Sequence, residues 1–361
     1  MKQFKKFYKR LKRKLIPPFY KELAMLVESF DQHAGEAPGI LYFGDSVLER
    51  VSWNDNDTST LGEMVSTRLK PNYNVCVISR TAYHPSIFLS LGQVLKITQK
   101  RPNLLILPIN IRCFSPQWDW EPLWQYDREI LAIEKFCNDP FRRIPRLVPS
   151  NKLTSTHHMQ NKFLKRTVKY PLTNFTRIGH FKELIATKPT ETQAINHRWR
   201  QIIIYHYLHP LRSDNQKLRN MQKLIKLMHE MDILVFSYIT PINYQAGKRI
   251  VGEEFTHIVS NNIATIFQAI TGCQKHICLG CVWNQHRLVV ADWSTMLSEN
   301  FFFHNNDPTE HLNEKGRSSL ADAIVKLVNN LVRKNVTESD GGGSKNLDNL
   351  LGSESAQLER S

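Results

Sequence analysis

The chain has 361 residues, of which 41% are hydrophobic, so it can bury one large core or two smaller ones, and this composition excludes a wholly disordered protein. Its formal net charge is +15, but eight Lys and Arg and no acidic residue fall within the first fourteen positions, so the rest of the chain carries only +7. Because the basic excess is concentrated in one arm and no recognition motif accompanies it, we expect no nucleic-acid partner.

The N-terminal arm, residues 1–36, begins with a basic amphipathic pattern. Between residues 1 and 16, Lys and Arg surround apolar residues at helical spacing until Pro17-Pro18, and these residues are Phe4, Phe7, Tyr8, Leu11 and Leu15. Such a helix either docks on an anionic membrane surface or packs on the domain with its basic face in water, and the pattern favours neither alternative.

The sequence predicts neither a transmembrane segment nor a signal peptide. No apolar run approaches the roughly 20 residues that a membrane-spanning helix needs. Charges also interrupt every apolar stretch near the N-terminus, where a signal peptide requires a continuous one. We therefore expect a cytoplasmic protein. A protein of this kind could attach peripherally to the cytoplasmic face of a membrane through residues 1–16.

The first part of an α/β domain is predicted over residues 37–118, where short apolar runs alternate with helical patterns. Residues 104–109 show no polar alternation, which is typical of a strand buried on both faces. Strands separated by helices predict a parallel sheet with helices on both faces. The predicted elements are strand 39–43, strand 73–78, helix 85–99 and strand 104–109.

Residues 119–215 break this rhythm, because they are rich in Trp, His, Arg and Lys and contain no clear strand, and we interpret them as a helical insertion or cap. The second part of the α/β domain is predicted over residues 216–334, and the polar residues 335–361 are expected to form a flexible tail. The elements expected in this part are helix 214–231, strand 233–239, helix 254–270, strand 288–290 and helix 314–333.

The six cysteines lack the dense spacing of a small disulfide scaffold, so we interpret them as reduced, mostly buried thiols. Cys273, Cys278 and Cys281 lie near His276 and His286, which together offer the ligand types of a zinc site. A second CxxC pair is missing, however, and the spacing fits no zinc-finger pattern. We therefore predict no metal and no cofactor.

Gly44-Asp45-Ser46 directly follows the first predicted strand, and a helix can begin at Val47. Open α/β sheets place their functional sites at the carboxyl ends of their strands. Backbone N–H groups at the start of the following helix can stabilise negative charge on a nearby oxygen, which suits a nucleophilic serine. Asp and Ser are also good helix N-caps, and the tripeptide taken alone favours this structural role.

His311 lies in a polar segment that precedes the last predicted helix. A serine hydroxyl is a poor nucleophile until a nearby base takes its proton, and the base works best when an acid fixes its tautomer. His311 could supply the base and Asp307 the acid. A lone histidine in a polar loop is more often a surface residue or a helix cap, but the strand-end serine in the same chain favours the catalytic interpretation.

Gly44-Asp45-Ser46 resembles the first sequence block of the SGNH/GDSL hydrolases, and His311-Leu312-Asn313-Glu314-Lys315-Gly316 resembles their last block, with His, Asn and Gly at the expected spacing. The resemblance implies Ser46 as nucleophile and His311 as base. It also implies a three-layer α/β/α fold with a flavodoxin-like, mostly parallel sheet, into which the helical segment is inserted. Asn110 and the Ser46 backbone N–H would then donate to an oxyanion.

Several positions depart from the pattern of this family. The third block usually reads Gly-x-Asn-Asp, whereas the chain has Pro108-Ile109-Asn110-Ile111, which looks more like branches that act on acyl groups of cell-surface polymers. The glycine of the second block has no clear counterpart in residues 79–83, where Ala82 is our candidate for the third oxyanion donor. The family's acid lies three residues before the His, where this chain has Pro308, so Asp307 is the candidate acid.

The resemblance implies a serine esterase or O-acyltransferase that forms an acyl-enzyme on Ser46, with an O-acyl ester of a carbohydrate or lipid as substrate. The alternative is a catalytically inactive SGNH-like module that binds or scaffolds at a membrane surface, which the missing glycine and the displaced aspartate favour. Two further residues are candidates for substrate binding. Arg112 could pair with an anionic substrate or brace its loop, and Asn243 could shape the pocket or belong to a plain turn.

Overall fold

Six strands form one sheet in the computed structural model, which describes residues 18–30, 37–52, 54–70, 72–115, 118, 125–138, 206–272, 282–285, 287–303 and 310–339. The strand order is β2-β1-β3-β4-β6-β5, in which β5 runs antiparallel to β6 and the other five strands are parallel. This parallel order is flavodoxin-like, as predicted. The strands are β1 Gly39–Gly44, β2 Asn74–Ser79, β3 Leu104–Ile109, β4 Leu234–Ile239, β5 Val282–Gln285 and β6 Leu288–Asp292.

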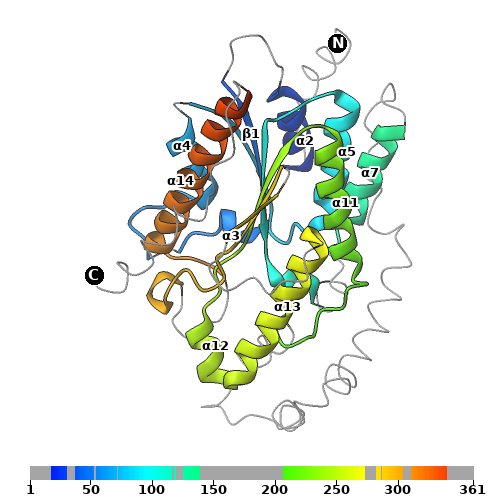
Figure 1. Ribbon diagram of the computed structural model, residues 1–361. Coiled ribbons are helices and arrows are strands. Elements are labelled where there is room, and N and C mark those ends of the chain that lie inside the picture. Colours follow the sequence, from blue (N-terminus) through cyan, green and yellow to red (C-terminus); the bar gives the residue numbers. More distant parts are fainter. Residues whose placement is uncertain are drawn as a thin grey trace.

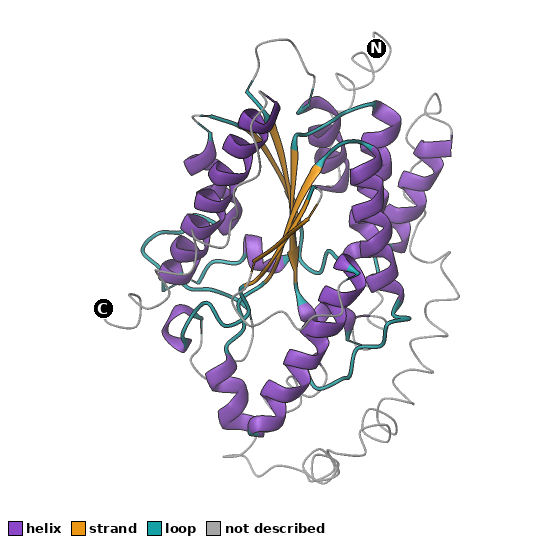
Figure 2. Ribbon diagram, viewed as in Figure 1, coloured by secondary structure: helices purple, strands orange, loops and turns teal. Residues whose placement is uncertain are grey.

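The sheet is covered by helices on both faces, which confirms the three-layer α/β/α fold (Figures 1 and 2). On one face, α4 (Leu61–Leu69) and α14 (Glu314–Ser339) lie side by side. On the other face lie α5 (Pro85–Thr98), α11 (Gln216–Glu230) and α13 (Glu253–Thr271). The two helical layers enclose two separate hydrophobic cores, one on each side of the sheet.

The central strand β3 shows why the apolar run predicted a buried strand. All six of its residues are buried, because β1 and β4 flank it and helices cover both of its faces. Its side chains alternate between the two cores, as the period of a strand requires. Leu105, Leu107 and Ile109 face the core of α5 and α11, whereas Leu104 and Ile106 face that of α4 and α14.

Helix α2 (Pro18–Glu28) begins where the sequence predicts a helical pattern to end. Proline is tolerated in the first turn of a helix, where its missing N–H would have no intrahelical partner, so Pro17-Pro18 can also precede a helix. Phe19, Leu23 and Leu26 are buried in the same core as α5. The α/β domain therefore includes part of the predicted arm, while residues 1–16 lie outside the described residues.

Three elements of the second half were not predicted or differ in length. Helix α12 (Tyr244–Val251) and strand β5 have no predicted counterpart, and α14 continues to Ser339 instead of ending near residue 333. In the first half α4 was also missed, although Thr60 and Glu63 form a capping box that marks its start. Each missed signal is short, and tertiary packing decides such elements more than local pattern does.

The predicted insertion is represented by α7 (Asp127–Asn138), which packs against α5 through Ala132, Ile133 and Phe136. Residues 139–205 lie outside the described part of the chain, as do residues 340–361 of the predicted tail. In the ranges that the structure describes, no helix is both long enough and apolar enough to cross a membrane.

Candidate active site

Ser46 and His311 meet at the carboxyl edge of the parallel sheet. Ser46 is the first residue of α3 (Ser46–Glu49), directly after β1, and its Oγ lies 3.1 Å from Nε2 of His311. The two residues are 265 positions apart in the sequence. Ser46 is buried, whereas His311 is half-buried. The hydroxyl and the imidazole are therefore at the hydrogen-bond distance expected of a nucleophile and its base.

Asp45 caps α3 and also contacts Asn110. Its Oδ1 accepts the Val47 N–H at 2.8 Å, and its Oδ2 accepts a bond from Asn110 Nδ2 at 2.7 Å. Asn110 Oδ1 in turn accepts the Arg112 N–H at 3.0 Å, so both ends of the amide are oriented. Because Nδ2 carries two hydrogens, one remains for a second acceptor such as an oxyanion. Burial raises the pKa of Asp45, and the bond from Val47, the charge of Arg112 and the bond from Asn110 oppose this rise.

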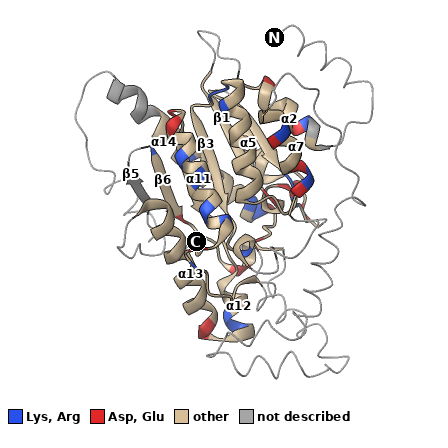
Figure 3. Cartoon of the chain, turned by 90° about the vertical axis from the view of Figure 1, so that its right-hand side faces the viewer, with Lys and Arg blue, Asp and Glu red and all other residues tan. Residues whose placement is uncertain are grey.

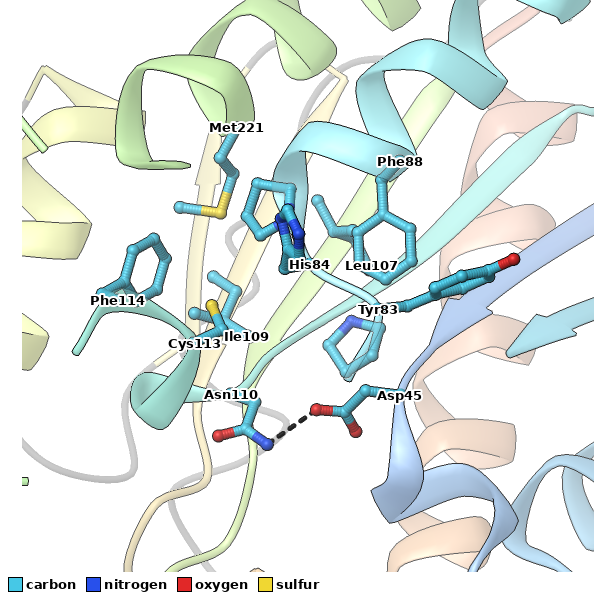
Figure 4. A pocket seen from close by; sticks show the side chains of 12 residues that line it. Asp45, Tyr83, His84, Phe88, Leu107, Ile109, Asn110, Cys113, Phe114 and Met221 are labelled. Carbon is cyan, nitrogen blue, oxygen red and sulfur yellow. Dashed lines mark hydrogen bonds between the residues drawn. The ribbon is translucent and has the colours of Figure 1, made fainter. Parts of the chain in front are cut away.

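Asp45 and Asn110 close one end of a largely apolar pocket between β3, α5 and α11 (Figure 4). The cavity itself is small, about 10 Å³, which is room for about one water molecule. Phe88, Leu107 and Phe114 contribute apolar walls above the hydrogen-bonded pair. Apolar walls of this kind disfavour an unpaired charge, because a buried charge without a partner is costly.

Ala82 occupies a turn after β2 with a φ of 65°, in the left-handed region that favours glycine. The position that lacks the expected glycine therefore keeps a backbone conformation typical of glycine. The turn is held from α2, where Glu22 pairs with Arg80 at 2.9 Å and accepts the hydroxyl of Tyr83. Because β2 pairs with β1 up to Gly44, this turn lies at the same sheet edge as the serine.

The segment that carries His311 is fixed through its backbone. Phe303 N–H donates to the His311 carbonyl, and Asn313 N–H donates to the Phe301 carbonyl, each at 3.0 Å. Asn313 Oδ1 accepts the Gly316 N–H at 3.0 Å, and a Cβ on Gly316 would lie 2.2 Å from the Phe301 carbonyl oxygen. Asn313 and Gly316 therefore shape the loop that carries His311.

Arg317 holds the start of α14 against the loop after α3. Its guanidinium is fully buried, and Nη1 lies 2.6 Å from the Asp55 carboxylate. It also donates to the carbonyls of Asp57 at 2.6 Å, Ser59 at 3.0 Å and Leu312 at 3.1 Å. This buried cation thus joins the loop that follows Ser46 and α3 to the segment that carries His311.

Glu310 directly precedes His311 and is fully buried. Its Oε2 lies 2.5 Å from Arg112 Nε, and its Oε1 accepts the Tyr207 hydroxyl at 2.6 Å. Burial raises the pKa of Glu310 to about 7, although the charge of Arg112 and the bond from Tyr207 act in the opposite direction. The sequence predicts no role for Glu310, whose one local signal is its position beside the candidate base His311.

Comparison with known proteins assigns the chain to no group. No protein-family model and no curated protein matches it. What supports a catalytic role is therefore the arrangement of the residues themselves, above all the approach of Ser46 to His311.

Arg112 and Asn243, the two candidate substrate-binding residues, both have partners within the protein. The Arg112 side chain is 9% exposed and pairs with Glu310, in agreement with the bracing alternative. Asn243 is 1% exposed and caps α12 by accepting the Ala246 N–H at 3.0 Å, in agreement with the turn alternative. Both side chains are thus engaged within the protein. Asp307, the candidate acid, lies outside the described residues.

The cysteines divide between the described and undescribed parts of the chain. Cys76 and Cys113 are buried free thiols and Cys137 is half-buried, as the sequence predicts for this group. The candidate zinc ligands, Cys273 to His286, lie outside the described residues. Within the described ranges, no group of three His, Cys, Asp or Glu residues could hold a metal ion.

Proposed function

We propose that the chain is a serine esterase or O-acyltransferase that acts on an O-acyl ester through an acyl-enzyme on Ser46. The observation that carries this proposal is the 3.1 Å approach of Ser46 Oγ to His311 Nε2 at the carboxyl edge of a parallel sheet. Asn110 lies beside the same turn, which supports its role as a side-chain oxyanion donor. Ser46 N–H and Ala82 N–H are the proposed backbone donors.

The proposed reaction has two acyl-transfer steps. Ser46 Oγ attacks the ester carbonyl while His311 Nε2 accepts the hydroxyl proton, and the negative charge on the carbonyl oxygen is held by the oxyanion donors. The C–O bond to the alcohol then breaks, and His311 returns the proton to that leaving oxygen. In the second step water or an acceptor alcohol gives its proton to His311 and attacks the acyl-enzyme, which frees Ser46. Water as acceptor gives hydrolysis, and an alcohol gives transfer.

A fluorescent fluorophosphonate tests the nucleophile directly. We expect it to label the wild-type protein at Ser46, with the modified peptide identified by mass spectrometry, because a base-activated serine attacks phosphorus as it attacks an ester. Ser46→Ala should abolish labelling and lower the hydrolysis of a short nitrophenyl ester by about 10⁴-fold or more.

Ser79→Ala is the matched control, because Ser79 ends the neighbouring strand β2 and is part-buried. It should label as the wild type does. A correctly folded wild-type protein that resists the probe would instead support a binding or scaffolding module.

We propose in addition that residues 1–16 attach this enzyme to an anionic membrane surface. Among the described residues, Arg219, Lys223 and Lys226 form an exposed basic row on α11, whereas acidic and basic residues are mixed on α7 (Figure 3). Deletion of residues 1–16 should abolish co-sedimentation with anionic liposomes, since each basic residue near such a surface contributes roughly 1 kcal/mol.

A triple Gln variant of the three α11 residues serves as the control and should still sediment. Equal binding of the wild type to neutral and anionic vesicles would refute electrostatic attachment.

A further inference from the structure

The loop that carries the base and the loop that carries the oxyanion donor are joined by one buried ion pair. Arg112 orients Asn110 through its backbone N–H, at 3.0 Å from Asn110 Oδ1. The same residue's guanidinium lies 2.5 Å from Glu310, which is covalently adjacent to His311. An unbroken chain of contacts thus runs from Asn110 through Arg112 and Glu310 to His311. Arg112 and Glu310 are about 200 positions apart in the sequence, so the pair links two distant segments of the chain.

Tyr207 completes the environment of this pair. Its hydroxyl donates a hydrogen bond to Glu310 Oε1 at 2.6 Å. Its buried ring packs edge-on against Phe255, with 5.5 Å between the ring centroids. One oxygen of Glu310 accepts the Tyr207 hydrogen bond and the other is in ion-pair contact with Arg112, in a place where the Glu310 side chain has no solvent exposure. A carboxylate bound in this way is rigid, because its rotation would leave a buried charge unpaired.

The charged and titratable groups around Glu310 come from three other segments of the chain. Arg112 lies on η1 (Ile111–Phe114), Tyr207 precedes α11, and Asp45 acts from the start of α3. Next to Tyr207, burial and the charge of Arg112 lower the pKa of His206 to about 3, so this imidazole is neutral at ordinary pH. The positive charge that faces Glu310 at close range is therefore that of Arg112.

We infer that Glu310 is a positioning residue of the proposed acyl-transfer site, which through Arg112 and Tyr207 holds the base His311 in register with the oxyanion donor Asn110. This inference rests on the proposed function. Glu310 itself contacts no reacting atom in this scheme, and its effect is transmitted through the two loops. A shift of about 1 Å between catalytic groups can lower a rate about 100-fold, so a clamp of this kind has measurable consequences.

The test is the second-order rate of fluorophosphonate labelling of Ser46 as a function of pH. We expect Glu310→Gln to slow labelling by about 10- to 100-fold near neutral pH, because the neutral amide no longer holds Arg112. Arg112→Met should slow it similarly, and the double variant should be no slower than either single one, because both changes break one interaction. Lys96→Gln, which removes an exposed ion pair with Glu230, is the control and should label at the wild-type rate.

The acid side of the pH profile distinguishes positioning from general stabilisation. Burial raises the pKa of Glu310 to about 7, so protonation of this carboxylate should slow the wild-type protein as the pH falls below that value. Glu310→Gln lacks this titrating group and should give an acid limb with a shallower slope. Because the Tyr207 hydroxyl lowers the pKa of Glu310, Tyr207→Phe should move the acid limb to higher pH while keeping the carboxylate.

Tyr207→Phe also keeps the inference testable if Glu310→Gln does not fold. Wild-type rates and slope in Glu310→Gln, additive single and double variants, or an unshifted acid limb in a folded Tyr207→Phe would each overturn the inference while leaving the proposed function standing. An unlabelled wild-type protein would overturn both.

Discussion

Replacing His311 with glutamine is expected to lower kcat/KM for a short nitrophenyl ester by about 10⁴-fold or more. The physical reason is that His311 Nε2 lies 3.1 Å from Ser46 Oγ and is the group proposed to take the hydroxyl proton. Glutamine has a similar reach and can still hydrogen-bond, but it cannot accept and return a proton at neutral pH. Initial rates at several ester concentrations measure this effect.

His257→Gln is the matched control for this measurement. His257 is exposed on α13, where it contacts Asn261 of the same helix, and its replacement should leave kcat/KM unchanged. Circular dichroism must show that both variants are folded. If His311→Gln kept more than about a tenth of the wild-type kcat/KM, the loss would be far smaller than removal of a catalytic base should cause. Another group would then have to serve as base, and the proposed mechanism would be wrong.

The largest effect on stability is expected at Arg317. Arg317→Met keeps most of the side-chain length but leaves the Asp55 carboxylate, which is 7% exposed, without its cation. Removal of one partner from a buried pair lowers the free energy of unfolding by about 3–5 kcal/mol. Three backbone carbonyls also lose a donor, which adds to the loss. Urea denaturation followed by tryptophan fluorescence measures the change.

Lys96→Met provides the comparison for an exposed pair. Lys96 and Glu230 are about half exposed, so loss of their 3.0 Å contact should lower the free energy of unfolding far less than Arg317→Met does. Similar losses for Arg317→Met and Lys96→Met would show that the buried network around Asp55 does not stabilise the fold as described.

The sheet and the meeting of Ser46 with His311 could be expected from the sequence for simple physical reasons. Strands buried on both faces, such as β3 and β4, are continuous apolar runs, and these runs were recognised with nearly correct bounds. Parallel strands end at one edge, so a Ser that follows such a strand has a predictable location. That His311 would lie beside Ser46 could be expected only through the family resemblance, because no local pattern links two residues that are so far apart in the sequence.

The remaining parts of the site depend on contacts that leave no local signal. Glu310 acquires its role from Arg112 and Tyr207, which come from two separate segments. The left-handed backbone conformation of Ala82 could not be predicted either, because alanine rarely adopts this conformation. A sequence pattern cannot show that the fold imposes it. Arg112 is open to two interpretations in the sequence, and its burial beside Glu310 could not be read from either.

The order of the strands has a consequence for synthesis of the protein. Ser46 follows β1 and His311 lies beyond β6, with β3 and β4 between these two strands in the sheet. His311 directly precedes α14, which packs beside α4. Under the proposed function, a nascent chain that leaves the ribosome from its N-terminus therefore lacks the base for Ser46 until the C-terminal segment has emerged. A serine-reactive reagent would then report the completion of folding, and an incomplete chain would be unable to acylate itself on unintended esters.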